Sequence, residues 1–416
     1  MSSSEKHTLV VGGGVIGAFC AWYLQQAGRK VTIIDRDDFG AGCSHANCGY
    51  VSPSHVFPLT SPGQISRGLK GMFSRNSALR IRPGFSPSLW MWLLKFAARC
   101  NRRDMFQAGH GRHALLQSSR RLYEEILENE LPDVEWKTDG LLFVFRDKDQ
   151  FEHFAETDRQ LAEHFDVRAQ PIDGSELETR EPALKPGLAG AWHYQNDAHL
   201  RPDRLMSALK QKLSDAGVTI LTRHEMQRFV SDSDRVSAVQ TPNGEIAADE
   251  FVVATGPLTP LLNKELGCRI PIQPGKGYSI TMPRPQICPR YPMLLEEVHV
   301  GITPFDSGYR IGSTMEFAGY NSRLSPERLQ YLRSGAAEYL KEPTAEPVLE
   351  EWFGWRPMTW DGLPYIDRTP KFRNVWVAAG HNMLGLSMGT ATGLLLTEIM
   401  TGSTPHIDPA PYRIGR

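Results

Sequence analysis

Three glycines near the start of the chain have the spacing of a dinucleotide-binding turn. The sequence G-x-G-x-x-G at residues 12–17 lies between an apolar, β-favouring run at 8–11 and a segment typical of a helix. In such a turn Gly12 permits the tight bend, Gly14 lets the backbone approach a pyrophosphate, and Gly17 lets the helix pack against the strand. The helix start then presents N–H donors and partial positive charge to the phosphates. The segment therefore predicts a bound dinucleotide.

Asp35 stands at the place where such a site binds a ribose. It closes a second β-favouring run at 30–34 and follows Gly17 at the interval that the motif requires. A carboxylate here accepts hydrogen bonds from ribose hydroxyls and repels a 2′-phosphate, which argues against NADP. The motif does not distinguish FAD from NAD, and a glycine-rich turn without a ligand is the alternative interpretation.

Two later segments favour FAD. An apolar run at 251–256 ends in Ala-Thr-Gly, as do the strands that return the chain beneath the cofactor in FAD-binding Rossmann domains. Another apolar run at 375–379 leads through the glycine-bounded loop 380–385 into a helix predicted at about 386–400. A helix start aimed at the flavin ring would stabilise the negative charge of the reduced flavin.

These elements belong to an α/β protein whose 416 residues are enough for two lobes. The net charge of −1 gives no reason to expect a nucleic-acid partner. The six cysteines form no C-x-x-C pair and no Cys/His group with zinc-like spacing, so no metal is expected. No stretch of about 20 apolar residues is present and the run from Leu9 is too short for a secretory signal. We therefore expect a cytoplasmic location.

The sequence resembles the D-amino-acid oxidase superfamily of FAD-dependent oxidoreductases, most closely the bacterial D-amino acid dehydrogenase small subunits and their hydroxyproline-oxidising relatives. The segments that carry the resemblance are 12–17, 43–49, 274–279, 354–364 and 380–385. The resemblance implies a Rossmann-type FAD-binding domain interleaved with an α+β substrate domain that contains a large mixed sheet. It assigns 1–60, 195–260 and 352–416 to the FAD-binding domain, and 61–194 and 261–351 to the substrate domain.

The same resemblance implies the contacts of the cofactor. The adenine half would bind to residues of the first turn and to Met226, which is expected in a strand after Ile220. Two loops would flank the flavin ring. The assigned residues are Gly12, Gly14, Val15, Ile16, Gly17, Asp35, Arg36, Ser44, Asn47, Cys48, Gly49, Met226, Gly256, Gly380, His381, Asn382, Gly385, Leu386 and Ser387. His45, Cys43 and Cys48 raise the question of covalent attachment, but the A-N-x-G pattern of this loop resembles the non-covalent branch.

Four residues are expected at the substrate. By resemblance Arg356, in a turn between Gly354 and Pro357, would hold the substrate carboxylate, because a guanidinium pairs with it through two parallel bonds. The alternative is a structural salt bridge. The hydroxyl of Tyr278 could reach the same carboxylate, or the side chain could belong to the core. His55 could line the pocket or be structural, and Met383 would lie near the substrate.

The predicted reaction is oxidative deamination of a D-amino acid. Hydride passes from Cα to flavin N5, the imine hydrolyses to a 2-oxo acid and ammonia, and a quinone or similar acceptor takes the electrons. Alternative substrates are glycine, sarcosine or a cyclic imino acid such as hydroxy-D-proline. A NAD-dependent dehydrogenase and a nucleotide-binding regulatory module are alternatives of another class. A homo- or hetero-oligomer is possible in this family.

A basic, aromatic segment at 64–103 could contact a membrane. No acidic residue occurs from Phe39 to Arg103, and a helix is expected to begin at Ser86-Pro87-Ser88. Tryptophans beside leucines and arginines suit a helix lying on an anionic membrane. A peripheral position on the inner face of the cytoplasmic membrane would then bring the enzyme to its quinone. The alternative is a helix buried in the core, with solvated arginines at its end.

Overall fold

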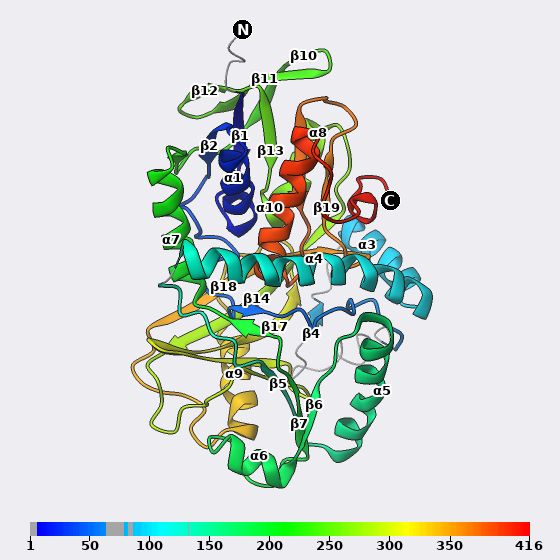
Figure 1. Cartoon of the computed structure of the whole chain (residues 1–416), viewed down its shortest axis with the longest axis vertical. Helices are drawn as coiled ribbons and strands as arrows, with labels where there is room; N and C mark the ends of the chain where they lie inside the picture. The colour runs from blue at the N-terminus through cyan, green and yellow to red at the C-terminus, as the bar shows by residue number, and fades with distance from the viewer. Residues whose placement is uncertain (1–5, 64–78, 82–85, 132) are drawn as a thin grey trace.

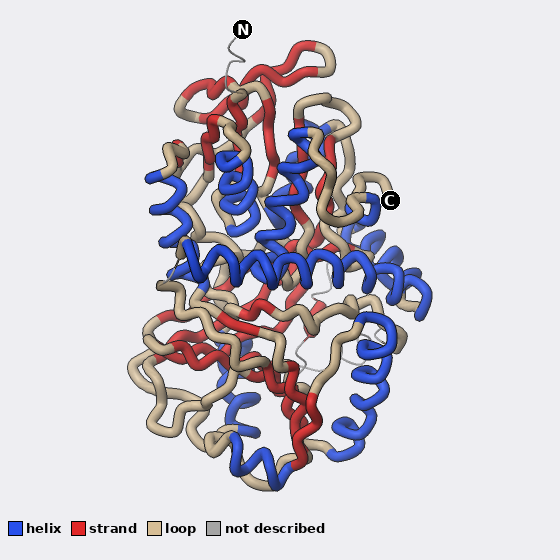
Figure 2. Tube along the Cα trace, viewed as in Figure 1, coloured by secondary structure: helices blue, strands red, loops and turns tan. Residues whose placement is uncertain are grey.

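The computed structural model describes residues 6–63, 79–81, 86–131 and 133–416. Two β-sheets dominate it, one in each half of the molecule, and the long helix α4 (Arg102–Asn129) runs across the boundary between them (Figures 1 and 2). The cofactor turn belongs to the upper sheet in Figure 1, and Arg356 belongs to the lower one. The functional site lies where the two halves meet.

The upper sheet has six strands in the order β19-β20-β13-β1-β2-β9. The strands are β1 (His7–Val11), β2 (Lys30–Ile34), β9 (Thr219–Leu221), β13 (Glu250–Val253), β19 (Tyr365–Arg368) and β20 (Val375–Ala379). All neighbours pair in parallel except β19, which is antiparallel to β20. The central strands are continuous apolar runs because both of their faces are covered.

Helices α1 (Val15–Gln26) and α10 (Gly385–Thr401) lie side by side on one face of this sheet (Figure 1). They approach closely because α10 presents glycine: a Cβ at Gly393 would lie 2.5 Å from the Phe19 carbonyl oxygen. Helix α1 follows β1 and helix α10 follows β20, two parallel strands with β13 between them, so both helix N-termini lie toward the same edge of the sheet. A small antiparallel sheet of β10 (Arg228–Asp232), β11 (Arg235–Thr241) and β12 (Gly244–Ala247) lies beyond the other end.

The lower sheet has nine mixed strands in the order β18-β14-β17-β16-β15-β5-β7-β6, with β4 paired to β17. The strands are β4 (Leu79–Ile81), β5 (Leu141–Phe145), β6 (Gln170–Asp173), β7 (Gly190–Tyr194), β14 (Ile272–Met282), β15 (Met293–Leu295), β16 (Val300–Phe305), β17 (Gly308–Phe317) and β18 (Glu350–Thr359). Helix α9 (Pro326–Tyr339) covers one face and packs on a buried apolar cluster. The opposite face is turned to the cofactor half.

The remaining elements lie between and around the two sheets. They are α3 (Pro87–Arg99), α5 (Lys148–Phe165), α6 (Gly174–Arg180), α7 (Pro202–Asp215), α8 (Asn263–Leu266), the 3-10 helices η1 (Gly256–Leu262) and η2 (Ala410–Tyr412), and the strand pair β3 (Tyr50–Val51) and β8 (Ala198–His199). Within the described chain, no helix is both long enough and apolar enough to span a bilayer.

The α/β class and the large mixed sheet are confirmed. The domain division stays a prediction, and one strand departs from it: residues 352–359 were assigned to the FAD-binding domain, but β18 pairs with β14 in the lower sheet. Met226 lies in the loop after β9, so the expected strand there is wrong.

Helix α3 differs from the buried helix that was one interpretation of its sequence. It begins as predicted, with Ser86 accepting from the Leu89 amide at 3.4 Å. It buries Leu89 and Trp92, whereas neighbouring large apolar side chains are exposed to solvent. Of the segment 64–103, residues 64–78 and 82–85 lie outside the described residues.

Candidate active site

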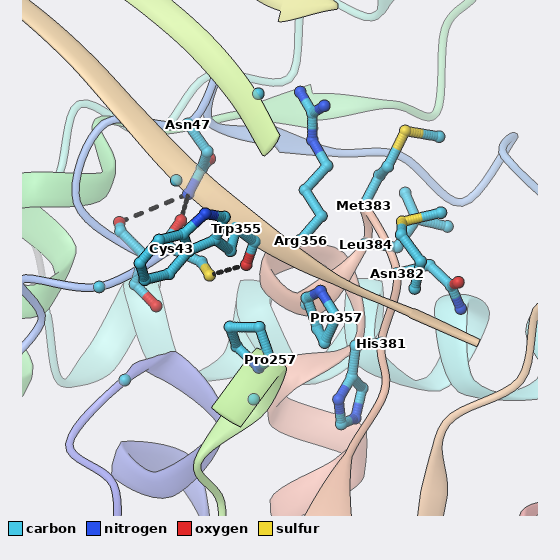
Figure 3. Close-up of a pocket in the computed structure, with 18 of the residues that line it drawn as sticks. Cys43, Asn47, Pro257, Trp355, Arg356, Pro357, His381, Asn382, Met383 and Leu384 are labelled. Carbon is cyan, nitrogen blue, oxygen red and sulfur yellow. Dashed lines mark hydrogen bonds between the residues drawn. The ribbon is translucent and has the colours of Figure 1, made fainter. Parts of the chain in front are cut away.

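A cavity of about 1060 Å³ joins the glycine turn of α1 to the face of the lower sheet. Its wall is made by the ends of β1 and β2, by the loops at 41–50 and 378–386, and by β18. Figure 3 shows Arg356 on its strand between Asn47 on one side and Asn382 and Met383 on the other. Most of the predicted cofactor and substrate residues therefore line one space, whereas Gly17, Gly380 and Ser387 are not among its lining residues.

The start of α1 is built for a phosphate. Gly12 has φ +112°, and a Cβ there would lie 2.5 Å from the Ala254 carbonyl oxygen. A Cβ at Gly17 would lie 1.9 Å from the Gly12 carbonyl oxygen, so only glycine allows this approach of helix and strand. The helix has no side chain at its N-cap and no acidic residue in its first turn. The positive end of the helix dipole therefore faces the cavity.

Asp35 closes β2 beside this turn. Its carboxylate accepts from the amides of Gly13 at 2.7 Å and Asp37 at 2.8 Å, which fixes its orientation in the cavity wall. Burial raises the pKa of Asp35 above its usual value, and these amide bonds oppose the shift. Val15, Ile16, Arg36 and Met226, which the resemblance assigned to the adenine half, line the same cavity, as does Gly256.

The loop at 43–49 is held against the lower sheet. Ser279 donates to the Ala46 carbonyl at 2.7 Å, and Arg310 donates to the Asn47 carbonyl at 2.8 Å. Arg310 is 1% exposed, and its contact with this loop had no signal in the sequence. Within the loop the Gly49 amide donates to the Asn47 side chain at 2.8 Å. The loop is therefore a rigid wall for the flavin ring.

Ser44 joins this loop to the phosphate end, because its hydroxyl accepts from the Val15 amide at 2.9 Å. Cys48 lines the cavity, and Cys43 donates to the Trp355 carbonyl (Figure 3). Burial raises the pKa of both thiols, that of Cys43 to about 11. His45 is tied to Glu350 at 2.7 Å. Thiols that stay protonated and an engaged histidine are poor nucleophiles, which supports the prediction of non-covalent FAD.

The loop before α10 forms the other side. Gly385 and Leu386 line the cavity at the start of α10, which has no side-chain cap, whereas Gly380 is not among the lining residues. His381 is buried, its Nε2 is 3.0 Å from the Thr392 hydroxyl, and burial lowers its pKa to about 3. His381 is therefore neutral, and the positive end of α10 is the electrostatic element here. Ser387 ties the helix to β3 by donating to the Tyr50 carbonyl at 2.9 Å.

Arg356 lies in the middle of β18 and not in a turn. Its guanidinium donates to the Thr314 carbonyl and passes over Gly277, where a Cβ would lie 2.5 Å from its Cζ. Thr314 and Ser313 both have positive φ, at +60° and +107°, so the backbone here is strained. This strained pair and Gly277 were not identified from the sequence, although the glycine in Pro-Gly-Lys-Gly was a usable signal.

No carboxylate among the described residues acts on Arg356, and burial lowers its pKa. The ionisable neighbours are the thiols of Cys43 and Cys48, and the stretches 64–78 and 82–85 contain no acidic residue. A desolvated guanidinium without an acidic partner is costly unless a ligand supplies one. The geometry therefore does not support the structural salt bridge that was the alternative for Arg356.

Tyr278 does not make the predicted substrate contact. Its side chain is 2% exposed and packs in the cluster beneath α9, and its hydroxyl donates to Glu316 at 2.7 Å. Side chains alternate across a strand, and Gly277 and Ser279 occupy the cavity face of β14. Tyr278 contributes only to the wall of the cavity. The alternation of side chains along β14 accounts for this difference from the predicted contact.

His55 and Met383 both line the cavity. The Nδ1 atom of His55 is buried and has no hydrogen-bond partner among the described residues. Burial and the nearby Arg112 lower the pKa of His55 to about 4, so the ring is neutral. Met383 is 42% exposed, which is high for an apolar side chain.

The lining of this cavity fits FAD: two helix starts without a side-chain cap, α1 and α10, reach it, and the carboxylate of Asp35 stands beside the first of them. The DAO family of FAD-dependent oxidoreductases matches residues 7–399. The chain belongs to this family. It is an enzyme that uses FAD, and the predicted family is confirmed.

Named relatives extend over the whole chain. D-amino acid dehydrogenase of Rhizorhabdus wittichii is 31% identical over 415 residues, covering 98% of this chain and 99% of the relative. The protein of the same name from Chromohalobacter salexigens is 32% identical over 418 residues, with 98% and 99% covered. Glycine oxidase from Geobacillus kaustophilus has the same fold, with a TM-score of 0.79, 23% identity and 99% of each chain covered. L-proline dehydrogenase from P. horikoshii gives a TM-score of 0.72 at 19% identity, covering 98% of this chain and 97% of that one.

Proposed function

We propose that this protein is a D-amino acid dehydrogenase that converts its substrate to a 2-oxo acid and ammonia. One observation carries the proposal: the guanidinium of Arg356 lies desolvated in the cofactor cavity with no acidic partner among the described residues. A substrate carboxylate would supply that partner. The relatives named D-amino acid dehydrogenase, which match over the full chain, support the same substrate class.

The side chains of the site bind and orient the substrate. Arg356 pairs with the carboxylate through two charge-assisted bonds, which fixes the direction of the Cα–H bond for one enantiomer. Bound FAD supplies the ring that accepts the hydride at N5. The substrate reacts with a neutral amine, whose lone pair assists as the imine forms. With pKa values of about 4 and 3, His55 and His381 are too weakly basic to take the ammonium proton at neutral pH, so the proton leaves to solvent.

A smaller or cyclic substrate is the second candidate. Relatives of the same fold are named for glycine, proline and iminodiacetate, and small or secondary amines would also satisfy Arg356. Anaerobic bleaching of the flavin by a panel of D- and L-amino acids, glycine, sarcosine and hydroxy-D-proline separates the candidates. Bleaching by sarcosine or glycine with none by any D-amino acid would replace the first proposal by the second. Admitting air afterwards distinguishes an oxidase from a dehydrogenase.

The proposed acceptor is a membrane quinone, and α3 is the proposed contact with the inner face of the cytoplasmic membrane. On α3 the side chains of Trp90, Met91 and Leu94 are 49%, 47% and 66% exposed, and Lys95 and Arg99 follow. Apolar and basic side chains on one surface helix favour an anionic bilayer. Flotation with anionic liposomes tests the contact, and Leu94→Glu should abolish it. Association with a second copy or another subunit remains part of the proposal, and sedimentation would measure it.

A further inference from the structure

The cavity has an apolar arm that neither the cofactor residues nor Arg356 occupy. The arm is lined by side chains of β4, α3 and η1, namely Ile81, Trp90, Leu94, Phe96, Leu258 and Leu261. None of the residues that these three elements contribute to the cavity wall is charged. The arm is continuous with the space beside the flavin loops, because the same cavity is lined by His381 and Met383. An apolar molecule could therefore reach the flavin from this side.

The cavity wall holds an unusual share of the exposed apolar side chains. Among the described residues ten large apolar side chains are exposed, and five of them line this one cavity: Leu59, Trp90, Leu94, Leu261 and Met383. Leu94 and Leu261 are the most exposed, at 66% and 62%, and they come from α3 and η1 of the arm. Exposed apolar residues that line one cavity indicate a binding surface, since single ones are normally scattered.

The apolar, uncharged wall of the arm is unfavourable for binding an amino acid. A zwitterion would lose the hydration of both its charges along a wall without a compensating charge. Basic side chains stand beside the opening: Lys95 is exposed, and Arg99 lies 4.9 Å from the Trp360 ring at the end of α3. An apolar opening flanked by cations suits a molecule that comes from an anionic lipid surface.

We propose that this arm is the binding site of a quinone electron acceptor, with Leu94 and Leu261 as its most exposed lining residues. The inference rests on the proposed function, because the amino acid supplies the electrons. The step is balanced: the reduced flavin gives two electrons and one proton, solvent gives a second proton, and the two carbonyls of the quinone become hydroxyls.

The test uses FAD-loaded enzyme whose flavin is reduced by light without any amino acid. It is mixed anaerobically with a decyl-substituted benzoquinone or with ferricyanide, and flavin reoxidation is followed. Leu94→Glu and Leu261→Glu should each lower the rate constant with quinone by about tenfold or more, because a charge replaces apolar contact. Ferricyanide should be reduced within twofold of the wild-type rate. Leu349→Glu is the matched control, since Leu349 is 57% exposed and outside the cavity.

A second measurement does not depend on turnover. Quinone added to the oxidised holoenzyme should quench the fluorescence of Trp90 and Trp92, and Leu94→Glu should weaken that binding in the same proportion as the rate. Unchanged quinone binding and reoxidation in both variants would overturn the proposal. So would an equal loss with quinone and ferricyanide, or a rise only in the KM of the amino acid. In this test the flavin is reduced by light, so the result does not depend on the amino acid substrate. If no amino acid reduced the flavin, the proposed function would be refuted, but the quinone test could still be carried out.

Discussion

Replacing Arg356 with lysine keeps a positive charge in the cavity and removes the second hydrogen bond to a carboxylate. A charge-assisted hydrogen bond contributes about 1.5–3 kcal/mol. Loss of one of two such bonds should lower kcat/KM by about 10- to 160-fold, since each 1.36 kcal/mol is a factor of ten. Arg356→Ala loses both bonds, about 3–6 kcal/mol, and should lower kcat/KM by roughly 10²- to 10⁴-fold.

The assay is the rate of anaerobic flavin reduction against substrate concentration. The flavin content per protein should be unchanged in both variants, because Arg356 lies on β18 and makes no part of the phosphate-binding turn. Arg333→Lys is the matched control: Arg333 pairs with Glu351 at 2.7 Å on the rim of the structure and should leave kcat/KM unchanged. A kcat/KM for Arg356→Lys within twofold of wild type, or an equal change in Arg333→Lys, would refute the assigned role.

Three further changes test the surroundings of Arg356 and one buried acid. Gly277→Ala should raise KM by displacing the guanidinium, since the new Cβ would lie 2.5 Å from its Cζ; steady-state kinetics measure this, and an unchanged KM contradicts it. Tyr278→Phe should leave kcat/KM nearly unchanged and lower the unfolding free energy by about 1–3 kcal/mol in urea, because the buried Glu316 loses a donor. Burial raises the pKa of Asp197 to about 7, so protonated Asp197 favours the folded state and that contribution is lost as pH rises from about 4 to about 7. The Tm of Asp197→Asn relative to that of wild type should therefore rise as pH increases over that range. A difference in Tm that does not change with pH would count against this.

The sequence predicts best the elements whose signal is local. β2 and β20 have the predicted bounds, and α10 begins and ends within one residue of its prediction. β2 and β20 are short β-favouring runs and α10 follows a glycine-bounded loop, so neighbours along the chain suffice. The glycine turn and Asp35 are likewise predicted from residues close together in the sequence.

The errors arise where structure depends on partners far away in the chain. Arg356 was placed in a turn because Gly354 and Pro357 surround it, yet they lie in a strand. β18 is an edge strand, and its Pro357 stands opposite Pro274 of β14, so each proline faces a residue that also lacks an N–H. That coincidence becomes visible only when the two strands are paired. The register also decides that Gly277, and not Tyr278, shares a face with Arg356.

Asn382 shows how the two halves act as one site. It has φ +54°, and its side-chain oxygen accepts from the Thr359 amide at 2.9 Å while its own amide donates to the Pro357 carbonyl at 3.1 Å. Asn382, in the loop before α10, thus takes the place of a neighbouring strand at the end of β18. Thr359, to which its side chain bonds, follows Arg356 by three residues. The strand proposed to anchor the substrate acid and the start of α10 therefore keep a fixed separation. In the proposed reaction hydride transfer depends on that separation, because orientation between the bound substrate and the ring contributes much of the rate. The two sequence blocks at 354–364 and 380–385 are consequently one structural unit.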